Sequence, residues 1–133
     1  MQVYRLDDQG HPTLTASRPG LAARALYPGG VRAPAGLASS CPGCMVPSYA
    51  LGFGPGGQAL TVVLDYIFPD NSSRDTAFSW PVTAAGGLAS ETSAARETWD
   101  GQPALAPDGR TIVDGSAFGR TAVGLWQLPA AAG

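Results

Sequence analysis

The stretch that decides the fold is "QALTVVLDYIF", residues 58–68, in which apolar side chains recur at every second position. The positions that share one side of an extended chain are Leu60, Val62, Leu64, Tyr66 and Phe68. Alternate side chains of a strand point to opposite faces of a sheet, so the pattern predicts a strand with one strongly apolar face. Asp65 lies on the weaker face, where we expect it to be exposed. A buried Asp65 carboxyl with a shifted pKa is the less favoured alternative.

Short extended runs separated by turn residues surround this strand. "QVYRL" (2–6) and "TLTAS" (13–17) flank the turn "DDQGHP" and predict a hairpin. "TAFSWPVT" (76–83) predicts a strand, which we place at a sheet edge because proline cannot donate to a ladder.

The C-terminal third repeats this arrangement. In "ALAPDGRTIV" the Pro107-Asp108-Gly109 turn joins two extended runs, because proline presets φ and glycine accepts the left-handed conformation. "AFGRTAVGLWQL" (117–128) predicts a final strand.

The remaining segments are rich in proline and glycine. A short helix is expected within "PGLAARALYPGG" (19–30), whereas "SETSAARETW" (90–99) fits a helix or a strand. Four prolines interrupt residues 31–57, which we expect to form a long loop or arm. Residues 1–133 are therefore predicted to be a single, mainly β domain: a small sandwich or barrel with long loops and at most two short helices.

The sequence lacks the features expected for two classes of partner, nucleic acids and membranes. All eight basic residues are arginines, and they are scattered among ten acidic residues for a net charge of −2, so no basic stripe for nucleic acid is present. The start "MQVYRLDDQG" has no basic leader and no apolar run typical of a signal peptide, so we expect none, and no apolar run is long enough to cross a membrane. We expect neither a nucleic-acid nor a membrane partner.

The "CPGC" motif, residues 41–44, contains both cysteines of the chain. A redox dithiol needs Cys41 at the start of a helix, which Pro47 prevents. A zinc site needs four ligands, so Cys41 and Cys44 could bind zinc only if two subunits shared the ion. We favour a simple turn over that shared site. His11 is the single histidine and lies in an exposed turn, a poor place for a general base. No catalytic, cofactor-binding or metal-binding residue is therefore predicted.

Large aromatic residues are typical both of cores and of interface anchors. For each of Trp80, Trp99 and Trp126 we favour a core position over an interface position. We take Tyr49, Phe53, Trp99 and Trp126 as the candidate interface residues.

Three short motifs carry a family resemblance: Trp99-Asp100-Gly101, Asp114-Gly115 and Ala122-Val123-Gly124-Leu125. Together with the weakly charged, Ala/Gly/Pro/Thr-rich composition, they resemble the capsid decoration (cement) proteins of lambda-type tailed bacteriophages. The resemblance implies a small β-rich subunit, often trimeric, that sits on the outside of a viral shell and stabilises it by bridging neighbouring capsid proteins. It implies no active site.

Three hypotheses of function follow. The favoured one is a non-enzymatic virion subunit, assembled in the host cytoplasm, which forms a homo-oligomer and binds the major capsid protein or another virion subunit. The alternative is a small ligand- or carbohydrate-binding β module, which would need exposed aromatic residues around a concave site. The third, an enzyme, would have to use Asp65, His11 or the thiols of Cys41 and Cys44.

Overall fold

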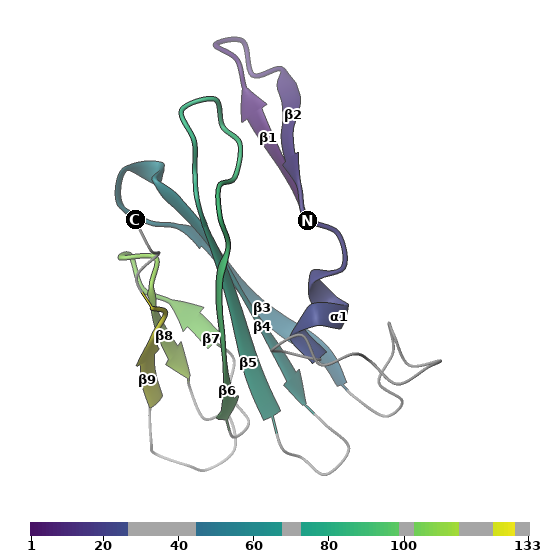
Figure 1. The fold of residues 1–133 in the computed structure, drawn as a ribbon, viewed down its shortest axis with the longest axis vertical. Coiled ribbons are helices and arrows are strands. Elements are labelled where there is room, and N and C mark those ends of the chain that lie inside the picture. The colour runs from purple at the N-terminus through teal and green to yellow at the C-terminus, as the bar shows by residue number, and fades with distance from the viewer. Residues whose placement is uncertain (27–44, 68–72, 99–102, 115–123, 130–133) are drawn as a thin grey trace.

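The computed structural model describes residues 1–26, 45–67, 73–98, 103–114 and 124–129, and these residues are mainly β (Figure 1). The strands are β1 (Gln2–Leu6), β2 (Pro12–Ser17), β3 (Met45–Phe53), β4 (Ala59–Ile67), β5 (Ser73–Pro81), β6 (Thr92–Thr98), β7 (Pro103–Leu105), β8 (Thr111–Asp114) and β9 (Gly124–Gln127). The helices are α1 (Leu21–Leu26) and the 3-10 turn η2 (Pro55–Gly57). Neither described helix is long and apolar enough to cross a membrane.

The described strands form three antiparallel sheets, and none of these sheets closes into a barrel. The hairpin β1–β2 projects from the end of the molecule, while β3-β4-β5-β6 form the central sheet (Figure 1). Helix α1 lies on one face of the central sheet, and the small sheet β7-β8-β9 lies on the other (Figure 1). The mainly β prediction is confirmed, with one short α-helix in the described part of the chain.

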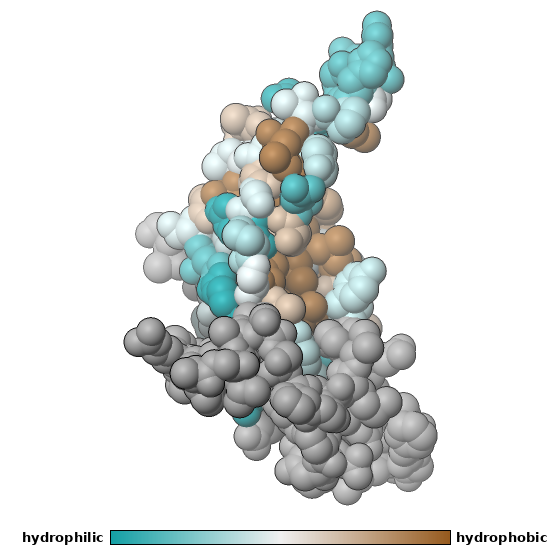
Figure 2. All heavy atoms as spheres, turned by 90° about the vertical axis from the view of Figure 1, so that its right-hand side faces the viewer, coloured by the Kyte–Doolittle hydropathy of each residue, from teal (hydrophilic) through white to brown (hydrophobic). Residues whose placement is uncertain are grey.

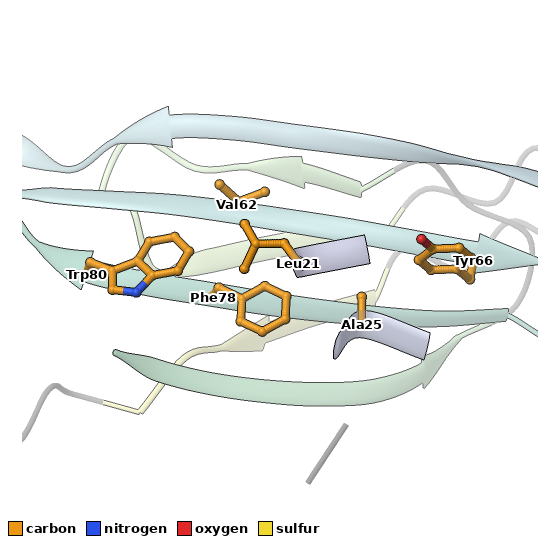
Figure 3. Packing of buried hydrophobic residues seen from close by; sticks show 6 residues of the cluster. All are labelled: Leu21, Ala25, Val62, Tyr66, Phe78 and Trp80. Carbon is orange, nitrogen blue, oxygen red and sulfur yellow. The ribbon is translucent and has the colours of Figure 1, made fainter. Parts of the chain in front are cut away.

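Strand β4 is buried on both faces. On the helix side, Val62 and Tyr66 pack with Leu21 and Ala25 of α1 (Figure 3). Phe78 and Trp80 of β5 complete that cluster, so the core position expected for Trp80 is confirmed. On the opposite side, the packed residues are Val63, Ala77, Ile112 and Leu128. The central sheet is therefore the middle layer of three.

The expectation that Asp65 is exposed is wrong. The side chain is 2% exposed, because the small sheet covers the face of β4 that the sequence pattern marks as the weaker one. An alternating pattern reports only the most apolar face of a strand, and a second layer supplied from far along the chain can bury the other.

The edge position predicted for the strand with Pro81 is also wrong. β5 lies between β4 and β6 and pairs with both. Pro81 is the last residue of β5 and pairs with Ala59, while the ladder with β6 runs only to the Ser79–Thr92 pair. The missing amide of Pro81 therefore interrupts no part of the β5–β6 ladder. The ambiguous stretch 90–99 supplies β6 and forms no helix over Thr92–Thr98.

The long loop expected over residues 31–57 needs a correction as well. Residues 45–53 form β3, which pairs with β4 along its length and has a register shift between Met45 and Ser48. Pro47 is tolerated in β3 because it lies beside that irregularity. Residues 31–44, including Cys41 and Cys44, lie outside the described residues, as do residues 117–123 of the predicted final strand. Residues 124–127 of that strand form β9.

The Pro107-Asp108-Gly109 turn is confirmed and also joins the two main sheets. Gly109 has a φ of +69°, and a Cβ atom there would lie 2.6 Å from the Cα of Gly54, just after β3. The Thr61 hydroxyl donates a 2.7 Å hydrogen bond to the Gly109 carbonyl. Only glycine satisfies both the backbone conformation and this close approach.

Burial of both faces of β4 predicts that Val62→Ala and Val63→Ala are both costly. Each substitution should lower the free energy of unfolding by about 2 kcal/mol, because each removes buried methyl groups and leaves a cavity. Urea denaturation followed by tryptophan fluorescence measures the loss. A Val63→Ala variant as stable as the wild type would contradict the three-layer arrangement.

The close contact of Gly109 with Gly54 predicts that Gly109→Ala lowers the free energy of unfolding more than a glycine-to-alanine substitution at a positive φ without such a contact. Gly109→Ala should cost at least about 2 kcal/mol, because it adds a steric clash to backbone strain. Gly10→Ala is the matched control: its φ is +82° and a Cβ there would meet nothing within 4 Å, so about 1 kcal/mol is expected. Equal losses, measured by the same denaturation, would show that the contact with Gly54 is unimportant.

Candidate interaction surface

Three large apolar side chains of β3 face solvent. Tyr49, Leu51 and Phe53 are 71%, 57% and 56% exposed, respectively. They alternate along the strand and pair with Leu64, Val62 and Leu60, so they share the face of the central sheet on which α1 lies. Figure 2 shows hydrophobic side chains gathered in the middle of this face.

The small side chains of β3 point the other way, into the molecule. Ala50 packs against the cluster between the two sheets, and a Cβ atom on Gly52 would lie 3.0 Å from Leu105 of β7. Over residues 49–53 the strand therefore turns its small residues inward, where they are partly buried, and exposes its large apolar ones. That is the reverse of what hydrophobic burial favours in an isolated domain.

The backbone of the same three residues faces away from the sheet. β3 pairs with β4 alone among the described strands, and the amide of Gly54 donates a 2.9 Å hydrogen bond to the Ala59 carbonyl. Residues of an antiparallel strand alternate between groups directed at one neighbour and groups directed away from it. Since Gly54 is directed at β4, the amides and carbonyls of Tyr49, Leu51 and Phe53 point outward. We call these three residues the β3 edge surface.

Helix α1 is fixed over β4 and β5, beside this surface. The Tyr66 hydroxyl donates to the Ala22 carbonyl at 3.2 Å, and the Thr76 hydroxyl donates to the Ala25 carbonyl at 3.1 Å. Two hydroxyls of the sheet thus bind helix carbonyls, one in the first turn and one in the last turn, where carbonyls lack a partner within the helix.

An ion pair between Arg24 and Glu91 also holds the helix. The Arg24 guanidinium binds both carboxylate oxygens of Glu91 and lies 5.0 Å from the centre of the Phe78 ring. The buried Trp80 indole donates to the same carboxylate at 3.1 Å. The hydrogen bonds from Arg24 are the main reason why the pKa of Glu91 is lowered, and they outweigh the effect of burial.

Two carboxyl groups lie opposite each other inside the molecule. Asp65 of β4 pairs with Asp75 of β5, and their side chains are 2% and 0% exposed. Asp75 in turn pairs with Arg96 of β6, whose guanidinium donates to the Leu125 carbonyl of β9 at 3.1 Å. Both carboxyls are out of reach of a dissolved substrate, so we interpret this row as part of the packing between the two sheets.

Of the other residues singled out from the sequence, the two that the structure describes, His11 and Trp126, lie apart from each other. His11 is exposed in the β1–β2 turn, where its Nδ1 is 3.0 Å from Asp7, whose other oxygen accepts hydrogen bonds from the amides of Gln9 and His11. Trp126 packs against the cluster between the sheets. Trp99, Cys41 and Cys44 lie outside the described residues. Within the described ranges, no group of three or more His, Cys, Asp or Glu residues could hold a metal ion.

The three candidate interface residues that the structure describes lie in two different places. Tyr49 and Phe53 come together on the β3 edge surface, whereas Trp126 lies on the other sheet. Leu51 completes the surface and was missed by sequence reasoning. Its signal is the alternation Tyr49-Leu51-Phe53, which the flanking prolines obscure.

A small pocket lies at the opposite side of the central sheet. Its lining residues are Ala59, Ser79, Pro81, Thr92, Arg110, Leu128 and Pro129. Its volume is about 80 Å³, whereas small-molecule sites usually occupy roughly 300 Å³ or more. This pocket is too small to support the ligand-binding alternative.

Comparison of the chain with protein-family models, curated proteins and solved structures gives no match. The function must therefore be argued from the geometry of the surface itself.

The Arg24–Glu91 ion pair predicts a pH-dependent effect of Glu91→Gln. Because the folded pKa of Glu91 is lowered, the pair stabilises the fold above the unfolded pKa, and this contribution is lost as the pH falls through the folded pKa. At pH 7 the variant should be about 1 kcal/mol less stable, a modest loss because Arg24 is half exposed and solvent screens the pair. The glutamine still offers an oxygen to Trp80.

Urea denaturation of both proteins between pH 7 and pH 3 measures the effect, and the two stabilities should converge below about pH 4. A difference that stayed constant over this range would mean that the ionised carboxylate contributes nothing.

Proposed function

We propose that this chain is a non-enzymatic assembly subunit that binds other protein subunits through the β3 edge surface. The observation that carries the proposal is that the same three residues present exposed apolar side chains and outward backbone groups. A partner strand laid along β3 would satisfy the backbone groups and cover the side chains at once.

The energetics favour such a partner. An unpaired strand edge is a template for further pairing, and proteins usually blunt it with charged side chains or proline. No charged residue occurs between Met45 and Gln58, and prolines stand only at the two ends of this stretch, Pro47 and Pro55. Covering two aromatic rings and a leucine at roughly 25 cal/mol per Å² of buried apolar surface would contribute several kcal/mol to binding.

The more specific form of the proposal is a virion protein that decorates or cements a capsid, with the major capsid protein or another virion subunit as partner. It is supported by the resemblance of the Trp99-Asp100-Gly101, Asp114-Gly115 and Ala122–Leu125 motifs to phage decoration proteins. Such subunits act by covering and bridging their neighbours, and an uncharged strand edge suits that action.

Site-specific photocross-linking tests this function. A photoreactive phenylalanine analogue replaces Tyr49 while the protein is expressed together with its natural partners. The matched control places the analogue at Leu125, which is 64% exposed on the other sheet. We expect position 49 to cross-link to a structural protein, identified by mass spectrometry, in a fraction that sediments as a large particle. Adducts from position 49 no more abundant than those from position 125, with the chain sedimenting as a small free protein, would contradict the proposal.

A further inference from the structure

We infer that the occupant of the β3 edge surface is a second copy of this chain, paired antiparallel about a two-fold axis at Leu51; this inference rests on the proposed assembly function. The two central sheets would then join through β3 into one continuous sheet across both subunits. The axis runs perpendicular to the sheet, so both copies of α1 lie on the same side.

The side chains of β3 are symmetric about Leu51. In an antiparallel pair centred there, Leu51 lies opposite its own copy, and Tyr49 lies opposite Phe53 of the partner. Aromatic residues directly opposite each other on one face are among the cross-strand pairs that stabilise sheets. The exposed side chains of the two β3 strands therefore form one continuous apolar strip, in which each aromatic ring lies opposite an aromatic ring and leucine lies opposite leucine.

The backbone selects the same register. The outward groups belong to Tyr49, Leu51 and Phe53, and a pairing centred on Leu51 sets each of them opposite another outward residue. Sliding the partner by two residues places Pro47 opposite Phe53, or Pro55 opposite Tyr49. Proline has no amide hydrogen to donate, so either shift removes a hydrogen bond from the ladder. In the centred register, Pro47 and Pro55 lie opposite each other, beyond the ladder.

The charge and the area of the β3 edge surface determine the expected affinity of the dimer. The stretch between Met45 and Gln58 is uncharged, so matching it with itself brings no like charges together. The exposed parts of the three side chains amount to roughly 400 Å² per subunit, which is less than the roughly 800 Å² per partner of a stable interface. We therefore expect a dimer that forms at about 10–100 µM and is strengthened inside a larger assembly.

A charge-swap experiment tests the register directly. Leu51→Lys and Leu51→Glu each place like charges opposite one another, and each should weaken the dimer at least about tenfold. In an equimolar mixture the introduced lysine lies opposite the introduced glutamate, so a heterodimer should form. This rescue requires position 51 to face itself. Leu125→Lys is the control for an added charge at a similarly exposed leucine and should dimerise like the wild type.

Sedimentation and native mass spectrometry give the masses, and circular dichroism confirms that each variant is folded. A wild-type protein that stays monomeric at about 200 µM, an oligomer that Leu51→Lys leaves unchanged, or a mixture without heterodimer overturns the inference. The proposed function fails separately: cross-links from position 49 to another structural protein would uphold it even when the two-fold pair does not form.

Discussion

Burial of β4 on both faces is the constraint on which the rest of the structure depends. Val62 requires a cover on one side and Val63 requires one on the other, and the chain supplies a single short helix and a small three-stranded sheet. The helix is held over β4 and β5 by the Arg24–Glu91 pair, while the turn at Gly109 fixes the second sheet against the end of β3. These two covers extend unequally over the central sheet, and among the described residues the 49–53 part of β3 is covered on one face only.

This unequal cover connects the fold to the proposed function. β3 turns Ala50 and Gly52 toward the small sheet, which approaches Gly52 so closely that a larger side chain would collide with Leu105. Its large residues consequently occupy the other face, beside α1 and in contact with solvent. An arrangement that costs free energy in a single subunit becomes favourable when a partner covers the same face, because the apolar area is then removed from water. The buried Asp65 and Asp75, with the exposed Arg96 beside them in the same row, lie on the opposite side of the sheet and have no part in this surface.

The sequence was most informative where structure is local. The strand centred on Val63, the first hairpin, the helix that begins at Leu21 and the Gly109 turn each depend on residues close together in the chain. The errors concern contacts between distant segments. Burial of Asp65 depends on a sheet formed some fifty residues later, and the internal place of β5 depends on the ambiguous segment that becomes β6. Prolines and glycines obscure the alternation of β3, so the sequence predicts Tyr49 and Phe53 as interface residues but neither the strand nor Leu51 between them.

Residue-resolved amide hydrogen exchange of β3, measured by NMR at low and high protein concentration, tests the claim that this strand edge pairs with a second copy of the chain. We predict that the amides of Tyr49, Leu51 and Phe53 exchange freely in dilute solution and become protected on concentration, while those of Ala50 and Gly52 are protected throughout. Equal protection of all five amides in the dilute protein, or outward amides that stay unprotected at every concentration, would contradict it.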